Sequence, residues 1–238
     1  MKERIQKILS ARGLTSRRAA EKLLLEGRIT VNGIPAKLGD QADPNTDLIL
    51  IDGKKLPLQP EPVWLMLYKP RGYVTTLHDE KGRKTAASLV DCGCRVYPVG
   101  RLDYASEGLL LFTNDGALAN ALMHPRHGIP KVYEVTVRGE LEHAEERLTR
   151  PIVLDGRPIR PPQVRLLRQK DEKASFEITI HEGRNRQIRR MCEAAGLEVL
   201  RLCRVQEGSL RLGTLRPGKW RYLTEEELFL IKQEVQNA

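Results

Sequence analysis

Asp103 is the side chain whose position most suggests chemistry. It lies in the stretch VGRLDYASEGLLLFTNDG, residues 99–116, two positions after Arg101 and shortly before the apolar run of residues 109–112. Such a run is typical of a buried strand, and a carboxylate at the rim of a strand can act as a nucleophile or as a general base. Residue types alone favour a simpler explanation, a surface turn with a structural ion pair. Other segments of the chain are therefore needed to distinguish this turn from an active site.

Tyr133 is a second candidate, because it belongs to a segment that alternates with a period of two. Residues 131–137 read KVYEVTV, the pattern of a half-buried strand with Tyr133, Val135 and Val137 on one face. By itself this pattern favours a core tyrosine. A ring that lines a pocket can instead stack on a planar base.

Four arginines fall within the seven positions of residues 184–190. The periodicity predicts a helix over residues 184–195 whose apolar face carries Ile188, Met191, Cys192 and Ala195. The opposite face carries Arg186, Arg189 and Arg190. A buried carboxylate resists ionisation unless a positive group lies beside it. Any of these three arginines has the spacing to supply that group, and spacing does not choose among them.

Positive charge is concentrated at the beginning of the chain. The 238 residues include 40 Lys and Arg against 31 Asp and Glu, a net charge of +9, and residues 1–37 hold nine basic and three acidic side chains. A basic balance of this kind indicates a polyanionic partner, usually a nucleic acid. Aromatic residues make up only 5% of the chain, which argues against a large base-stacking sheet.

Several enzyme classes leave no motif in the sequence. It contains no G-x-G-x-x-G after a strand, no G-x-x-x-x-G-K-[ST] and no G-x-S-x-G, which excludes the common dinucleotide, P-loop and serine-hydrolase sites. Cys92-Gly93-Cys94 is a CxC motif without a second pair at zinc-ligand spacing. We therefore expect no metal and no cofactor. A glycosidase with Asp103 and Glu107 as its two carboxylates would explain neither the basic N-terminal region nor the arginine-rich segment.

The elements that must position these residues divide into two parts. Residues 1–57 are expected to form a small module of two helices, the first over residues 2–12 and the second capped by Thr15 or Ser16, followed by short strands. Asn32-Gly33 and Asp52-Gly53 are hairpin turn signals within that module.

Residues 58–62 are proline-rich and read as a stiff linker to a second domain, residues 63–238. In that domain strands outnumber helices and are joined mostly by hairpins or single helices. One strand is expected over residues 96–103, ending at Asp103. The sequence therefore predicts an α+β fold with a largely antiparallel sheet.

The N-terminal module resembles a known RNA-binding fold. The pattern S-R-R-A-A-E…L-L…G-R-I-T-V-N-G, within residues 2–56, is similar to the αL module that takes its name from a small-subunit ribosomal protein. The resemblance implies that one basic face of this module binds RNA. The cations expected to make those contacts are Arg4, Lys7, Arg17, Arg18, Lys22 and Arg28.

The second domain resembles the RNA pseudouridine synthases of the RsuA family. Four ordered motifs carry the likeness: K-P-R-G at 69–72, G-R-L-D-x-x-x-E-G-L-L-L-x-T-N-D-G at 100–116, K-V-Y at 131–133 and E-G-R-N-R-Q-I-R-R-M at 182–191. With the αL module in front, the resemblance covers nearly the whole chain. It implies a mainly antiparallel-sheet pseudouridine synthase domain. The implied reaction breaks the glycosidic carbon–nitrogen bond of a uridine, turns the uracil and forms a carbon–carbon bond to the same ribose, without a cofactor.

The resemblance also implies roles for individual residues. Asp103 would be the catalytic carboxylate, as nucleophile or base, and Arg189 its cationic partner through charge-assisted hydrogen bonds. Tyr133 would stack on the uracil. Arg101 would lie where the target base leaves the RNA stack, a step that costs a few kcal/mol. Further RNA contacts are expected from Arg184 and Arg186.

The expected partner is ribosomal RNA. Within its family the sequence is most similar to enzymes of the large ribosomal subunit, which favours 23S ribosomal RNA or a pre-ribosomal particle. Small-subunit ribosomal RNA, and a non-catalytic RNA-binding role in ribosome assembly, are the alternatives. No apolar run reaches the ~18 residues of a membrane span, and the N-terminal segment lacks the apolar core of a signal peptide. We therefore expect a cytoplasmic monomer.

Overall fold

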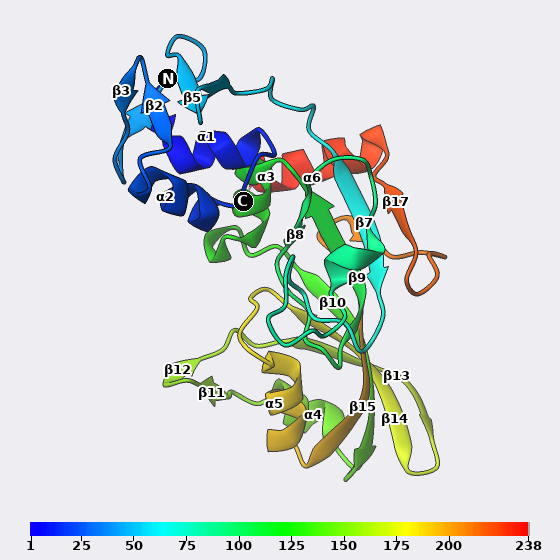
Figure 1. Ribbon diagram of the computed structural model, residues 1–238. Coiled ribbons are helices and arrows are strands. Elements are labelled where there is room, and N and C mark those ends of the chain that lie inside the picture. The colour runs from blue at the N-terminus through cyan, green and yellow to red at the C-terminus, as the bar shows by residue number, and fades with distance from the viewer. Residues whose placement is uncertain (238) are drawn as a thin grey trace. The chain divides into compact units, whose positions relative to one another are not determined.

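The computed structural model describes residues 1–237, which form two compact units (Figure 1). The first unit comprises Met1–Val63 with the short segments Cys92–Val96 and Asn114–Gly116. The second comprises the remainder of the described chain. Within residues 1–237 no helix has both the length and the apolar character needed to cross a membrane.

Two short helices, α1 (Ile5–Ala11) and α2 (Arg17–Leu25), pack together in the first unit. Ser16 caps α2 as predicted, because its hydroxyl accepts a 3.1 Å hydrogen bond from the Ala19 N–H. The helix predicted from residue 2 begins only at Ile5. The two preceding residues form strand β1 (Glu3–Arg4), which pairs with β4 (Gln41–Ala42). The helices and strands enclose a core that contains Ile5, Leu9, Ala20, Leu24 and Ile29.

A four-stranded antiparallel sheet of order β3-β2-β5-β6 completes the first unit. Its strands are β2 (Ile29–Val31), β3 (Ile34–Pro35), β5 (Ile49–Ile51) and β6 (Lys54–Lys55). Both predicted hairpin turns are present, with Asn32 at φ 52° before Gly33 and Asp52 at φ 49° before Gly53. Asn, Asp and Gly tolerate this left-handed backbone, which explains why the turn signals were reliable.

A nine-stranded sheet dominates the second unit, in the order β13-β14-β10-β15-β9-β7-β17 (Figure 1). Two short strands, β8 and β16, pair beside this path with β9 and β15. The strand bounds are β7 Trp64–Lys69, β8 Tyr97–Val99, β9 Glu107–Thr113, β10 Lys131–Gly139, β13 Gln163–Lys170, β14 Lys173–Ile180, β15 Leu197–Glu207, β16 Leu210–Arg211 and β17 Trp220–Tyr222. Among these strands every pairing but that of β9 with β15 is antiparallel. The predicted α+β class with a largely antiparallel sheet is confirmed.

Several short or exposed strands escaped sequence reasoning, among them β11 (Val153–Leu154), β12 (Arg157–Pro158) and β13. The edge strand β13 has the sequence QVRLLRQK and is almost wholly exposed, so it shows none of the apolar alternation of a half-buried strand. The hairpin of β11 and β12 has two residues in each strand, too few for a period to be visible.

The helices of the second unit lie against this sheet. They are α3 Gly116–Met123, α4 Ala144–Thr149, α5 Gln187–Ala194 and α6 Glu225–Gln236, with 3₁₀ turns at Ala86–Leu89 and Pro125–His127. Thr224 and Glu227 form the predicted capping box of α6. Helix α5 packs on β15 and starts three residues later than predicted. Arg186 precedes it with a left-handed φ of 51°, a conformation that a right-handed helix cannot contain.

The buried core of the sheet lies along its central strands. Every residue of β7 is buried, and so are six of the seven residues of β9. Their apolar side chains share a cluster with Ile231 of α6 and Ile129, which precedes β10. The loop that contains Asp103 thus leads directly into β9, one of two strands that are almost completely buried.

Candidate active site

The site is built at the only parallel pairing among the named strands of the described chain. There Cys203 and Arg204 of β15 pair with Glu107 and Gly108 of β9. At Gly108 the backbone has φ +107°, and a Cβ added there would lie 2.2 Å from the Arg204 carbonyl oxygen. Only glycine permits so close an approach of two backbones. This approach joins the two antiparallel halves of the sheet.

Asp103 lies in a loop that leads into this junction. The strand predicted over residues 96–103 ends at Val99, where β8 ends, and the next seven residues form no regular structure. The prediction failed because the loop is fixed by side chains instead of a strand partner. The Thr75 hydroxyl donates to the Leu102 carbonyl at 2.7 Å and accepts from the Leu102 N–H at 3.1 Å.

Lys69, at the end of β7, also hydrogen-bonds to this loop. Its side chain is fully buried, and its ammonium donates to the carbonyl oxygens of Pro70 and Asp103, both at 3.1 Å, and of Ser106 at 2.7 Å. Burial lowers the pKa of Lys69 to about 8, opposed by the negative charges of Asp103 and Glu107. The K-P-R-G motif by itself predicts no role for Lys69. A lone lysine at the end of an apolar run was the available signal.

One cavity of about 410 Å³ in the second unit brings together five of the residues singled out from the sequence. They are Arg101, Asp103, Tyr133, Arg184 and Arg186. Asp103 is partly exposed, whereas sequence reasoning expected a buried carboxylate. A cavity of this size is in the range of small-ligand sites.

The back of the cavity is formed by β10 and β15, and a β-bulge determines which side chains line it. The register pairs Lys131 with Glu207 and Tyr133 with Arg204, with one extra residue, Val205, on β15. Without that bulge, Arg204 and Glu207 would point to opposite faces of the sheet. With it, both line the cavity beside the two residues of β10. Sequence reasoning missed this pair because alternation alone cannot reveal a bulge.

The charges at the back of the cavity form a buried network. The Arg204 and Glu207 side chains are 2% and 4% exposed and form an ion pair at 3.2 Å, while the Lys131 ammonium lies 3.8 Å from the other Glu207 oxygen. Arg204 also donates to the Leu109 carbonyl at 2.8 Å. Burial raises the pKa of Tyr133, opposed by the Arg204 guanidinium, so the phenol stays protonated.

Arg189 does not take the position expected for it. On the first turn of α5, its guanidinium donates to the Ala105 carbonyl at 2.9 Å and forms no ion pair with Asp103 among the described residues. The two charges still interact, since Asp103 partly offsets the lowering of the Arg189 pKa by burial and by Arg186. The helix begins later than predicted, so Arg186 lies outside it. The Arg189 side chain contacts the backbone of the Asp103 loop, at the Ala105 carbonyl.

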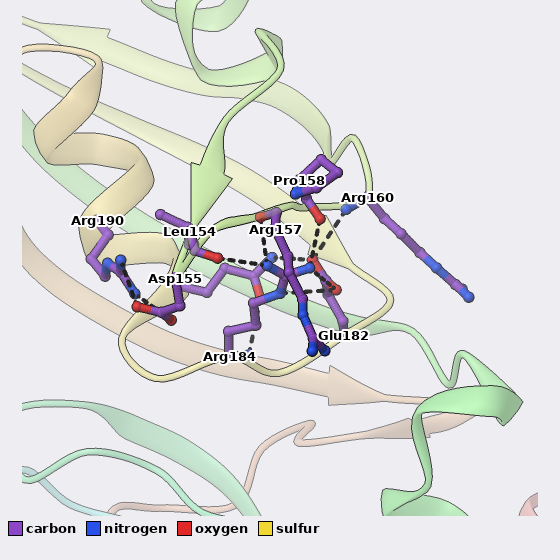
Figure 2. Close-up of polar contacts among 9 residues, drawn as sticks. Leu154, Asp155, Arg157, Pro158, Arg160, Glu182, Arg184 and Arg190 are labelled. Carbon is purple, nitrogen blue, oxygen red and sulfur yellow. Dashed lines mark hydrogen bonds and ion pairs between the residues drawn. The ribbon is translucent and has the colours of Figure 1, made fainter.

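Arg184 is held by several contacts to the protein, as Figure 2 shows. Its guanidinium donates to the carbonyls of Leu154 at 2.9 Å, Arg157 at 2.8 Å and Pro158 at 2.6 Å, and pairs with Glu182 at 3.3 Å. These bonds occupy the donors that the sequence-based prediction had assigned to RNA. Arg184 instead anchors the β11–β12 hairpin.

The same hairpin is held a second time by α5. The Arg190 guanidinium forms a two-pronged contact with the Asp155 carboxylate, at 3.0 and 3.2 Å (Figure 2). Arg190 is therefore also committed to the protein. Of the arginines considered as partners for Asp103, only Arg189 reaches its loop.

In the first unit, all the cations predicted to bind RNA are exposed. Lys7 pairs with Glu3 at 2.6 Å, and Arg28 with Asp52 at 2.7 Å and Glu26 at 3.2 Å. All three pairs lie at the surface, and surface pairs contribute only about 0–1 kcal/mol, so phosphate groups can compete for these side chains. Arg4, Lys7 and Arg17 surround one hollow of about 370 Å³.

Comparison with known protein families finds two matches. Residues 63–194 match the family described as RNA pseudouridylate synthase. Residues 3–48 match the S4 domain. The first match spans more than half of the chain and contains Asp103, Tyr133 and Arg189.

Individual proteins resemble the chain over almost its whole length. An uncharacterised RNA pseudouridine synthase of Aquifex aeolicus is 44% identical, with 96% of this chain and 93% of that protein covered. The ribosomal large subunit pseudouridine synthase B of Bacillus subtilis is 42% identical, with 95% and 94% covered. A crystal structure of a pseudouridylate synthase superposes with a TM-score of 0.68 at 29% identity, covering 96% of this chain and 99% of the other.

Proposed function

The chain belongs to the RNA pseudouridylate synthase family, and on that premise we propose that it isomerises a uridine of large-subunit ribosomal RNA with Asp103 as its catalytic carboxylate. It carries an S4 domain before the synthase domain, so its substrate is RNA. The observation that carries the proposal is the single cavity lined by Asp103, Tyr133 and Arg101.

The reaction is an isomerisation in which one bond at the ribose C1′ atom replaces another. The bond from C1′ to uracil N1 breaks, the base turns, and C1′ bonds to C5, which gives up its proton while N1 gains one. Asp103 serves as nucleophile or as base, and either role needs the ionised carboxylate. The Asp103 side chain is partly exposed and lines the cavity, where a bound nucleotide can reach it.

The other residues bind and position the base. Tyr133 lies at the back of the cavity, where its ring offers a face for stacking on the uracil. Arg101 is exposed at the cavity and fills the space that the base leaves in the RNA stack. Arg189 acts on Asp103 through the Ala105 carbonyl and through its charge. Each of these side chains therefore has a task that is separate from bond breaking.

One observation supports the large subunit as the source of the RNA, and a second supports RNA in general as the substrate. Two relatives, from Bacillus subtilis and Vibrio vulnificus, carry the name ribosomal large subunit pseudouridine synthase B, at 42% and 38% identity. The S4 domain offers six exposed cations for phosphate contacts: Arg4, Lys7, Arg17, Arg18, Lys22 and Arg28.

The test is to map pseudouridines in ribosomal RNA from a strain that lacks the gene. Chemical derivatisation followed by primer extension locates each pseudouridine. We expect the loss of a signal from 23S RNA and its return when the wild-type gene is supplied. Loss from 16S RNA would contradict the large-subunit assignment, and unchanged maps of both RNAs would contradict the proposed substrate altogether.

A further inference from the structure

Lys131 is a buried cation in the cavity to which the proposed mechanism gives no task. It opens β10, two residues before Tyr133 and on the same face of the sheet. Its side chain is 16% exposed and lines the cavity that contains Asp103. A charged group that is largely removed from water costs free energy unless its surroundings compensate.

The protein satisfies only some of the hydrogen-bond donors of Lys131. Its ammonium donates to the Ile129 carbonyl at 3.2 Å, and Glu207 lies 3.8 Å away. An ammonium carries three donors, and 3.8 Å is too long for a hydrogen bond, so among the described residues two donors are left for the cavity. Arg204 differs in its access to the cavity, because its side chain is only 2% exposed, although its Nη2 atom makes no hydrogen bond within the described residues.

The buried network has an excess of positive charge. Lys131 and Arg204 contribute two positive charges and Glu207 one negative charge, all beside the cavity. A fixed positive field in a water-poor cavity stabilises negative charge much more than it would in water. The remaining question is which negative charge appears there during the reaction.

That charge develops on the uracil. When the bond from C1′ to N1 breaks, its electron pair goes to N1 and spreads over the two carbonyl oxygens of the ring. If Asp103 instead added first to the ring, electron density would still move to a carbonyl oxygen. In both sequences the base becomes anionic before the bond to C5 forms. It becomes neutral again when its electron pair forms the C5–C1′ bond, and the later loss of the C5 proton with protonation of N1 leaves that charge unchanged.

We propose that Lys131 is a catalytic residue that hydrogen-bonds and electrostatically stabilises the uracil anion formed between cleavage of the nitrogen bond and formation of the carbon bond. Glu207 and Arg204 are positioning residues, since their ion pair and the cross-strand register hold the ammonium at the cavity wall. The inference rests on the proposed function. It adds a residue that acts on the leaving base, whereas Asp103 acts on the ribose or the ring.

The test compares two substrates in single-turnover reactions of the full-length protein. One is RNA with uridine at the target position, and the other has 5-fluorouridine there. Because 5-fluorouridine has no proton on C5, its reaction stops once the carbon bond has formed and yields no pseudouridine. Consumption of the target nucleotide is therefore measured for both substrates, by nuclease digestion and mass spectrometry. Fluorine withdraws electrons and stabilises the departing anion by itself, so the second substrate needs less help from a cation.

Lys131→Met is expected to lower the rate with uridine by about 100-fold, the cost of losing one preorganised donor at a developing anion. With 5-fluorouridine the loss is expected to be several-fold smaller. Lys131→Gln keeps a neutral donor and should lose less activity, with the same dependence on substrate. Lys173→Met, an exposed lysine of β14 away from the cavity, is the matched control and should match the wild type with both substrates.

The Met variant should fold, because it leaves Glu207 paired with Arg204 and removes the excess buried charge. Equal losses with both substrates, or an unaltered rate with uridine, would overturn the role of Lys131. If Lys131→Met did not fold, the same comparison with Lys131→Gln decides. Failure of the proposed function itself would be recognised separately, because the wild type would then convert neither substrate.

Discussion

Gly108 is the residue on which the geometry of the active-site loop depends most strongly. It brings β9 against β15 where the two antiparallel halves of the sheet meet, five residues after Asp103. In Gly108→Ala the new Cβ would lie 2.2 Å from the Arg204 carbonyl oxygen and 2.6 Å from the Arg204 nitrogen. Both atoms belong to the backbone, so no side-chain rotation relieves the contact.

Two penalties add at this position. A positive φ costs a non-glycine residue about 1–3 kcal/mol. Overpacking in a close-packed interior costs about 1–3 kcal/mol more. We therefore expect Gly108→Ala to lower the free energy of unfolding by about 3–5 kcal/mol, a large share of the roughly 5–15 kcal/mol that stabilises a typical protein.

The control is Gly213→Ala, which separates the two penalties. Gly213 also has a positive φ, +60°, but an added Cβ would meet no atom within 4 Å. It should lose only the backbone part, about 1–2 kcal/mol. The loss at Gly108 should therefore exceed the control by about 2 kcal/mol, since overpacking alone costs about 1–3 kcal/mol.

Denaturant unfolding followed by tryptophan fluorescence suits this measurement. The chain has two tryptophans, Trp64 on β7 and Trp220 on β17, so the signal reports on the second unit. If the two alanine variants were equally stable, the close approach of β9 and β15 would not be what requires glycine at residue 108. The account of the loop's support would then be refuted.

Three other perturbations test separate parts of the structure. Pseudouridine formation should fall as the pH rises through about 8, because deprotonated Lys69 loses one of its three donors, two of which bind the Asp103 loop. This inflection should be absent in Lys69→Met. The free energy of unfolding should not fall together with the rate. The pKa of Lys69 is lower in the folded than in the unfolded protein, so above pH 8 the unfolded chain binds the proton more tightly and rising pH favours the folded state. A rate that stays constant up to pH 9.5 would contradict the role of Lys69. Replacing Arg17, Arg18 and Lys22 of the S4 domain by alanine should weaken RNA binding and make the affinity less dependent on salt concentration. An unchanged salt dependence would show that these three side chains do not contact the RNA. Arg184→Lys cannot reproduce the fork of bonds to three carbonyls, so amide exchange of the β11–β12 hairpin should speed up; unaltered exchange would show that other contacts hold the hairpin.

The parts of the fold that follow local rules were readable from the sequence. Alternation placed Tyr133 on a strand, and Thr224 with Glu227 marked the start of α6. Asn32-Gly33 marked a hairpin because few other residues adopt that backbone. The motifs also indicated the residues gathered around Asp103.

The remainder depends on contacts between distant segments. The bulge at Val205 turns Arg204 and Glu207 to one face, yet nothing in the local sequence marks it. The left-handed Arg186 shortens α5, which no apolar periodicity reveals. Arg189 reaches the loop of Asp103 through the Ala105 carbonyl and not through the carboxylate, so its role as partner of Asp103 stays a prediction.

The central claim is that Asp103 is the catalytic carboxylate, and Asp103→Asn tests it most directly. Asparagine keeps the size and shape of the side chain but cannot act as an anionic nucleophile or base. Purified wild-type and variant protein are compared for pseudouridine formation on the target RNA and for RNA affinity at one salt concentration. The account predicts that the variant binds RNA nearly as tightly as the wild type and forms no detectable pseudouridine. Normal turnover by Asp103→Asn would contradict it.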